Sequence, residues 1–189
     1  MNYCKIIARN MSTMADKSLK LVLKQIRLES EGTLSFDLAL PNEEPLPSFS
    51  AGAHIDVQIP NGPKRSYSIV SSSAVRSYWR IAVKRSIKSE GGAAWFHQQA
   101  RVGMCIETSS PKNNFMLHES ENETIFIVGG IGITPILSMI ETLNQQGRRW
   151  TLHFANPSLK KMAFAGHLKK LAKQNDNVVN LYFSDANQP

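Results

Sequence analysis

The sequence predicts a β plus α/β fold, in which a six-stranded antiparallel Greek-key barrel is followed by a partial, doubly wound parallel sheet. Two observations support this prediction. Short segments of alternating apolar and polar residues recur at regular spacing in the first part of the chain, as they do in small closed barrels. Later the order changes to strand, helix, strand, helix, strand, which is typical of a parallel sheet. We therefore divide the chain into a flexible leader at 1–18, a barrel at 19–111, a linker at 112–122 and a partial α/β domain at 123–189.

Each strand of the barrel is predicted from its own alternation and from the turn residues that flank it. Thr33–Leu40 alternates cleanly between apolar and polar residues. His54–Pro60 alternates as well, and it ends at Asn61-Gly62-Pro63, a strong turn signal. A short helix is predicted over 93–100, opened by a pair of glycines. The remaining strands are predicted over 19–28, 65–71, 78–85 and 104–108.

The α/β part begins with Thr124–Val128, a continuous apolar run that is expected of a strand buried on both faces. After the turn Gly129–Pro135, apolar residues repeat at helical spacing up to Gly147, which is expected to end the helix. A strand over 150–155, a helix over 162–173 and a strand over 178–183 complete this part. So thin a sheet would expose unpaired backbone groups at its open edge. We therefore expect either that the chain is a fragment or that something covers this edge.

Composition excludes several classes of protein. The 189 residues are 42% hydrophobic and 20% charged, which is ordinary for a globular protein. No apolar run approaches the roughly 20 residues that span a bilayer, and none of signal-peptide length follows Lys5 and Arg9, so we expect a cytoplasmic protein. The two cysteines, Cys4 and Cys105, are too few for an all-cysteine iron–sulfur cluster and lack the spacing of a metal site.

The net charge of +7 admits two interpretations. The basic residues are scattered and form no stripe with interleaved aromatic residues, so we expect no nucleic-acid partner and no membrane partner. They form either an ordinary solvated surface or a surface that attracts anionic cofactors or an acidic protein.

The segment Arg65-Ser66-Tyr67-Ser68 has the residue types that a flavin site needs. Alternate side chains of a strand share a face, so Arg65 and Tyr67 are expected to point one way and the two serines the other. A flavin needs a cation for its phosphate, an aromatic wall and a hydroxyl near its reactive nitrogen, and this segment supplies all three. Solvent-facing strands often carry the same residue types, so a plain surface strand is the alternative interpretation.

Two glycine-rich turns have features of phosphate-binding sites. Gly91-Gly92 opens a helix with uncrowded backbone N–H groups, although ordinary loops also contain such pairs. At the first β-α turn, glycines of Gly129–Pro135 would let the backbone approach a pyrophosphate. Thr134 is expected to cap the helix that follows and Pro135 to lie in its first turn. The spacing is not GxGxxG, and a tight turn in an α/β protein without a ligand is the alternative.

Together and in this order, these segments resemble the phthalate dioxygenase reductase family, which includes vanillate demethylase reductases and belongs to the ferredoxin–NADP reductase superfamily. The resemblance extends from about Leu19 to Asp185. The matching segments are Gly52–Gly62, Arg65–Ile69, Val83–Arg85, Gly91-Gly92, Pro111–Phe115 and Val128–Ile136.

The resemblance implies a reductase that binds FMN in the barrel and NADH in the α/β domain, and that serves a Rieske-type oxygenase or a separate ferredoxin. FAD and NADPH are the alternative cofactors. Lys160-Lys161 follows the second α/β strand, where a ribose phosphate could lie, although exposed lysine pairs are common. Carried over by position, the flavin contacts are Arg65, Tyr67, Ser68, Val83, Lys84, Gly91 and Gly92, with Ser68 as the catalytic residue, and the dinucleotide contacts are Gly130, Gly132, Thr134 and Pro135. Val83 and Lys84 would lie along the flavin edge by backbone or side chain, and His97 lies in the family's phosphate loop.

The sequence also departs from the family pattern. Ala93 stands where the family's glycine loop usually has a serine, and one phosphate hydrogen bond of about 0.5–1.5 kcal/mol is lost with it. The chain stops before the family's cysteine-glycine segment near the nicotinamide and before its four cluster cysteines. A truncated flavin-binding module without NADH turnover is therefore the alternative function, and a remnant that binds neither cofactor is a third.

Overall fold

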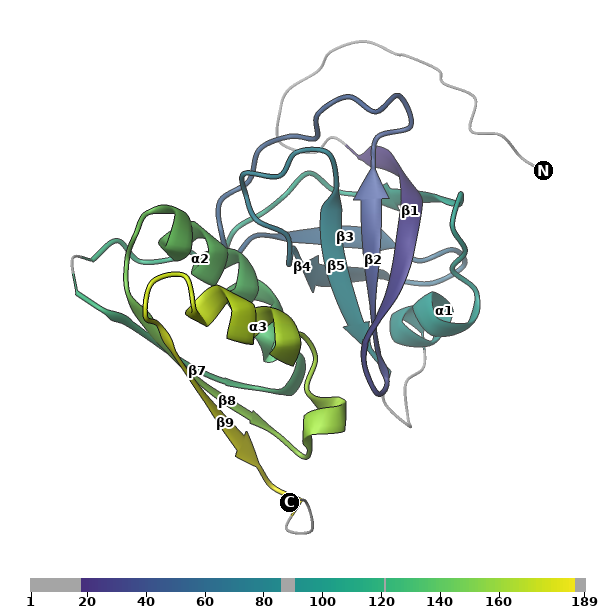
Figure 1. Ribbon diagram of the computed structural model, residues 1–189. Coiled ribbons are helices and arrows are strands. Elements are labelled where there is room, and N and C mark those ends of the chain that lie inside the picture. The colour runs from purple at the N-terminus through teal and green to yellow at the C-terminus, as the bar shows by residue number, and fades with distance from the viewer. Residues whose placement is uncertain (1–17, 86–90, 121, 186–189) are drawn as a thin grey trace.

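A computed structural model describes residues 18–85, 91–120 and 122–185 of the chain. Within them the chain forms a barrel and an α/β domain that lie side by side (Figure 1). The predicted leader, apart from Ser18, lies outside the described residues, and so does the end of the predicted α/β domain at 186–189. None of the described helices is long and apolar enough to cross a bilayer.

The first domain is the predicted six-stranded antiparallel barrel. Its strands are β1 (Leu19–Ser30), β2 (Thr33–Ala39), β3 (His54–Gln58), β4 (Lys64–Ser68), β5 (Trp79–Lys84) and β6 (Cys105–Thr108). They pair in the order β4-β3-β6-β1-β2-β5. Just after β4, Ile69 bridges to Ile81 of β5, and the Val70 N–H donates to the Arg80 carbonyl at 2.7 Å. These contacts join the two ends of the sheet and close the barrel.

Side chains of β5 alternate between the barrel core and the outside. Trp79, Ile81 and Val83 are buried in the core, as the pleat of a strand requires. The short helix α1 (Gly92–Gln98) adds Phe96 to the same core, where its ring centroid lies 4.7 Å from that of Phe36. The intervening β5 residues therefore face away from the core, toward the second domain.

The second domain is the predicted three-stranded parallel sheet. Its elements are β7 (Thr124–Gly129), the 3₁₀ turn η1 (Gly130–Gly132), α2 (Ile133–Gln145), β8 (Trp150–Asn156), the 3₁₀ turn η2 (Leu159–Lys161), α3 (Ala165–Ala172) and β9 (Val178–Phe183). The strands lie in the order β7-β8-β9, and α2 and α3 cover one face (Figure 1). Gly147 ends α2 as predicted: its φ of 66° is left-handed, and Arg148 N–H donates to the Leu143 carbonyl at 2.9 Å.

The prediction that the first α/β strand is buried on both faces is wrong for the described chain. In β7, Phe126 is buried against the helices, but Ile125 and Ile127 are 63% and 86% exposed. Side chains alternate along a strand, and among the described residues the helices cover one face of the sheet only. The face that carries the two isoleucines has no layer over it within those residues.

The described residues of the two domains are hydrogen-bonded to each other at several places. Near α2, the Gly52 N–H donates to the buried Ser138 Oγ at 3.0 Å, and Ala51, Val70 and Ala82 of the barrel domain belong to the α/β core. Near η2, the Glu31 N–H donates to the Lys160 carbonyl at 2.8 Å. Hydrogen bonds and a shared apolar core therefore fix the orientation of the domains.

Candidate cofactor-binding site

Strand β4 places Arg65 and Tyr67 on one face, as the sequence predicts. Within the β3–β4 hairpin, Arg65 lies opposite Val57 and Tyr67 lies opposite Ile55. Ser66 points the other way, because its hydroxyl donates to the Asp56 carboxylate at 2.6 Å. The hairpin thus presents a guanidinium and a phenol together.

The start of α1 packs directly on these two side chains. A Cβ atom on Gly92 would lie 2.7 Å from the Tyr67 Oη and 2.9 Å from the Arg65 Cγ, so only glycine allows this approach. Gly91, which precedes the helix, has a left-handed φ of 78°. Arg65, Tyr67 and the glycine pair therefore come together in the fold. Ala93 follows in the first turn, half-buried against the barrel core.

The environment of Tyr67 keeps its phenol neutral. The side chain is half-buried, and its ring meets Phe96 edge-on at 5.2 Å. Burial raises the pKa of Tyr67 above the ordinary value of 10.0, and the nearby Arg65 charge opposes that rise. The hydroxyl therefore stays protonated at neutral pH and can donate a hydrogen bond.

The end of β5 is tied to α1. The Val83 side chain is buried in the barrel core, so only its backbone is available to a ligand. His97 Nε2 lies 2.9 Å from the Val83 carbonyl oxygen, to which a protonated Nε2 donates. In this structure His97 anchors α1 to the barrel.

Lys84, the next residue, reaches the glycine turn of the second domain. Its Nζ lies 3.7 Å from the position that a Cβ on Gly130 would occupy. Gly130 itself has a left-handed φ of 54°, which favours glycine. The end of β5 therefore lies between the two glycine-rich segments that the sequence singles out, with α1 bonded to Val83 and η1 next to Lys84.

The turn after β7 differs from the prediction in one respect. Gly130–Gly132 form a 3₁₀ turn that leads straight into α2 at Ile133, and Gly132 is the N-cap. Thr134 is therefore inside the helix and does not cap it; its hydroxyl donates to the Ile131 carbonyl at 3.0 Å. Pro135 lies in the first turn of the helix, as predicted. A Cβ on Gly132 would lie 3.2 Å from the Val128 Cγ2, so the turn is tight.

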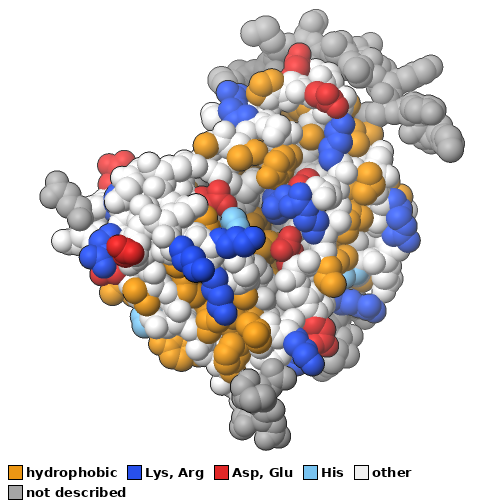
Figure 2. All heavy atoms as spheres, in the orientation of Figure 1, with side chains coloured by type: hydrophobic (Ala, Val, Ile, Leu, Met, Phe, Trp, Pro, Cys, Tyr) orange, Lys and Arg blue, Asp and Glu red, His pale blue; other side chains and the backbone are white. Residues whose placement is uncertain are grey.

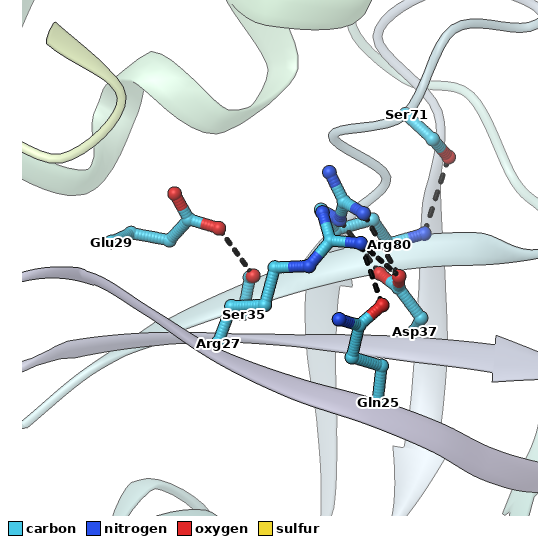
Figure 3. A network of polar contacts seen from close by, with 7 residues as sticks. All are labelled: Gln25, Arg27, Glu29, Ser35, Asp37, Ser71 and Arg80. Carbon is cyan, nitrogen blue, oxygen red and sulfur yellow. Dashed lines mark hydrogen bonds and ion pairs between the residues drawn. The ribbon is translucent and has the colours of Figure 1, made fainter. Parts of the chain in front are cut away.

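A charged network on the outer surface of the barrel was not predicted (Figure 3). Asp37 of β2 accepts two hydrogen bonds from Arg80 of β5, at 2.6 and 2.8 Å, and lies 3.6 Å from an Arg27 nitrogen. The hydrogen bonds to Asp37 raise the pKa of Arg80, although its burial opposes this. Asp37 and Arg80 are 43 residues apart in the sequence, and no local pattern links them.

This network faces a hollow between the domains. A pocket of about 310 Å³ separates Arg27 and Arg80 of the barrel from Glu141 and His167 of the α2–α3 pair. His167 Nε2 lies 3.0 Å from the Glu141 carboxylate. Figure 2 shows charged side chains of both signs along this boundary.

Sequence reasoning also gave no role to Gly52. A Cβ atom on Gly52 would overlap the Phe115 carbonyl oxygen, and the Gly52 φ of 92° is left-handed. The segment that crosses it is held by Asn113, whose amide donates to the carbonyl oxygens of Ser50 and Ala51 at 3.2 and 3.0 Å. In the sequence, the glycine between Ala51 and Ala53 was the signal that could have indicated a close backbone contact at this point.

Matches to known protein families cover nearly the whole chain. Residues 20–117 match the oxidoreductase FAD-binding domain, and residues 126–189 match the oxidoreductase NAD-binding domain. The chain is 44% identical over 178 residues to the phenoxybenzoate dioxygenase subunit beta of Ectopseudomonas oleovorans, covering 94% of this chain and 54% of that protein. It is 43% identical over 115 residues to the phthalate dioxygenase reductase of Burkholderia cepacia, covering 61% of this chain and 36% of that protein.

Two solved structures share the fold over at least 90% of this chain. Phthalate dioxygenase reductase superimposes with a TM-score of 0.81 and 32% identity over 90% of this chain and 53% of that chain. A type IV self-sufficient cytochrome P450 monooxygenase gives a TM-score of 0.82 and 28% identity over 96% of this chain and 24% of that chain. The chain spans about half the length of the first curated relatives that it matches.

Proposed function

The chain belongs to the oxidoreductase family defined by this FAD-binding domain, and we propose that it passes electrons from a nicotinamide dinucleotide through a bound flavin to a protein acceptor. One observation carries the proposal. The end of β5 lies between the Arg65–Tyr67–Gly92 cluster and the Gly130 turn, so a flavin in the first and a dinucleotide at the second would be neighbours.

The residues of the first cluster fit a flavin. The exposed Arg65 beside the glycine pair suits its phosphate, and the half-buried, neutral Tyr67 suits an aromatic wall. Ser68, half-buried at the end of β4, is kept as the residue beside the reactive nitrogen. When bound, a flavin accepts two electrons from a reduced nicotinamide and releases them singly. We propose FMN as this flavin, on the family resemblance, with FAD as the alternative.

The second turn fits a dinucleotide through its backbone. Gly130 and Gly132 themselves contribute no side chain to the turn, and Pro135 lies in the first turn of α2. The Thr134 hydroxyl already donates to Ile131, so we assign Thr134 to shaping the turn. Lys84 Nζ beside Gly130 adds a positive charge for the pyrophosphate.

We propose the electron acceptor on the basis of the names of the relatives. One relative carries the name of a dioxygenase subunit and another that of a dioxygenase reductase, so we propose a Rieske-type oxygenase component or a separate ferredoxin as the electron acceptor. The net charge of +7 is suited to an acidic partner. A flavin-binding module without turnover is the alternative function.

The absorption spectrum of the purified protein tests this function. We expect the yellow spectrum of a bound flavin, and we expect NADH or NADPH to bleach it under anaerobic conditions. Chromatography of the released cofactor identifies it as FMN or FAD. A protein that keeps its flavin but is not bleached is the module without turnover, and a protein that binds no added flavin contradicts the proposal.

A pair of variants tests the site itself. Arg65→Gln should weaken FMN binding roughly tenfold or more, because a hydrogen bond to a charged group is lost, while the fold stays intact. Lys64→Gln is the matched control: it removes the same charge from the neighbouring residue on the opposite face of β4 and should leave FMN affinity unchanged. Equal affinities for both variants would remove Arg65 from the site.

A further inference from the structure

Helix α1 lies against the side of the barrel where β4 and β5 are not paired. Ile69, just after β4, bridges to Ile81 of β5, and toward the end of β5 no further pair joins the two strands within the described residues. α1 contacts both strands instead, since Gly92 at its start packs on β4 and His97 in its last turn reaches β5. One short helix therefore links the two strands at this point.

The hydrogen bond of His97 joins α1 to a fixed part of the barrel. Its Nε2 lies 2.9 Å from the Val83 carbonyl oxygen, and the imidazole is half-buried. Nε2 carries a hydrogen in the protonated ring and in one of the two neutral tautomers, so the ring can donate in either charge state. The Val83 side chain is buried in the barrel core, and its backbone lies opposite Leu34 in the β2–β5 ladder. The strand therefore holds the end of the helix in place.

α1 depends on contacts of this kind, because it has little stability of its own. It spans seven residues, and helices shorter than about 12 residues are marginal in water without tertiary packing. Gly91, at its N-cap, has no side chain that could cap it. Phe96 holds the buried side of the helix, with its ring edge-on to Tyr67 at 5.2 Å. His97 adds the directional, polar contact that packing alone does not provide.

The position of α1 in turn restricts Arg65. Gly92 approaches so closely that an added Cβ would lie 2.9 Å from the Arg65 Cγ. The Arg65 residue is otherwise exposed, and the hydrogen bond from its guanidinium to the Lys64 carbonyl is long, at 3.3 Å. Packing of the helix on the stem therefore limits the directions in which the guanidinium can point.

We propose that His97 is a positioning residue for the flavin phosphate: by tying α1 to Val83, it keeps Gly92 against the stem of Arg65 and so holds the guanidinium where the phosphate binds. His97 itself contacts neither the flavin nor the dinucleotide. The inference rests on the flavin-binding part of the proposed function and adds to it a residue outside the proposed contacts.

Two flavins separate this role from a general loss of stability. FMN has the phosphate that Arg65 is proposed to bind, and riboflavin has the same ring system without it. Each is titrated by fluorescence into protein from which any co-purified flavin has been removed. In His97→Ala the affinity for FMN should fall about tenfold, because a hydrogen bond to a charged group is weakened. The affinity for riboflavin should stay unchanged.

Two amide variants test the hydrogen bond itself. The amide nitrogen of glutamine can reach the place of the imidazole Nε2, whereas that of the shorter asparagine reaches only the place of Nδ1. His97→Gln should therefore bind FMN nearly as well as the wild type, and His97→Asn should bind it as weakly as His97→Ala. A His97→Gln variant no better than His97→Ala would contradict the role of this bond.

Gln98→Ala is the matched control, because Gln98 is the next residue of the same helix and is exposed. It should leave the affinities for both flavins unchanged. Equal losses for FMN and riboflavin in His97→Ala, or unchanged FMN binding, overturn the inference while the proposed function stands. A wild-type protein that binds neither flavin contradicts the proposed function and the inference with it.

Discussion

Gly92 is the residue at which the first turn of α1 touches β4. Gly92→Ala should displace the Tyr67 phenol and the Arg65 stem, because the new Cβ would lie within 3 Å of both. We expect the affinity for the proposed flavin to fall about tenfold while the free energy of unfolding falls by about 1 kcal/mol or less, since Arg65 is exposed and Tyr67 is only half-buried. Flavin titration and urea unfolding measure the two effects.

Gly166 of α3 provides the control for this variant, because a Cβ atom added there would have nothing within 4 Å of it. Gly166→Ala should stabilise the protein by about 0.5–1 kcal/mol through helix propensity and leave the flavin affinity unchanged. If Gly92→Ala behaves like Gly166→Ala in both measurements, the close packing of α1 on β4 has no part in flavin binding.

Asp56 makes stability depend on pH at the acid end. The ammonium of Lys112, at 2.8 Å, and the Ser66 hydroxyl lower the pKa of Asp56 below its ordinary value of 3.8. The folded state therefore binds fewer protons than the unfolded chain in this range, so the stabilisation is present above the unfolded pKa and is lost as pH falls through the folded pKa. Asp56→Asn should be destabilising at pH 7 and nearly neutral at about pH 2, measured by urea unfolding.

The same experiment with Lys112→Gln checks the cause. This second substitution should destabilise the Asp56→Asn variant less than it destabilises the wild type, because the Asp56–Lys112 ion pair is already gone. An Asp56→Asn variant that is destabilised equally at both pH values would show that the carboxylate is not held by these partners.

At single residues, the sequence predicts side-chain direction well and helix starts less well. Alternation along β4 places Arg65 with Tyr67, because a strand has a fixed period of two. Thr134 was expected to cap α2, but the glycine turn adopts a 3₁₀ conformation that continues into the helix. Glycine adopts a wide range of backbone conformations, so the residue types alone do not show whether this turn stops before the helix or continues into it.

At the scale of elements, the Asp37–Arg80 pair joins β2 to β5 across the barrel surface. The two residues face each other in register, and their side chains are 6% and 17% exposed. Asp37→Leu should destabilise the protein by about 3 kcal/mol, because it leaves a largely buried guanidinium without its main partner. Asp37→Leu combined with Arg80→Met should recover most of this loss, since an apolar pair replaces an ionic one.

A double-mutant cycle tests this coupling. The free energy of unfolding in urea is measured for the wild type, Asp37→Leu, Arg80→Met and the double variant. A double variant at least as destabilised as the sum of the two single variants would show that the two side chains do not depend on each other. Arg27 lies 3.6 Å from the same carboxylate but is 42% exposed on its side chain, so we expect Arg27→Met to cost less than about 1 kcal/mol.

Element order was predictable and element pairing was not. The strand β9 has the predicted bounds, and β8 extends one residue beyond them, because alternation and flanking turns are local signals. The Asp37–Arg80 pair depends on β2 lying next to β5, which is a property of the closed sheet. The exposed Ile125 and Ile127 show the same limit: an apolar run identifies a strand but not the layers that cover it.

At the scale of the whole molecule, the two domains share part of one core. Ala51, Val70 and Ala82 of the barrel domain pack into the α/β core, and the backbone of Gly52 is bonded to Ser138 of α2. Each domain alone would lose this apolar contact and leave a buried N–H without an acceptor. We therefore expect both domains to unfold in a single cooperative transition.

Tryptophan fluorescence can follow the domains separately, because Trp79 and Trp95 belong to the barrel core and Trp150 belongs to the α/β core. In Trp150→Phe the remaining signal reports the barrel, and in Trp79→Phe with Trp95→Phe it reports the sheet. For each variant, the fluorescence midpoint in urea should coincide with the midpoint by far-UV circular dichroism.

Ser138→Ala should shift both midpoints of a given variant together, by about 1–2 kcal/mol in unfolding free energy, because it removes the acceptor of the Gly52 N–H. Two separate midpoints within one variant would mean that the interface is too weak to couple the domains, and the proposed flavin and nucleotide sites would then lie on independently folding parts.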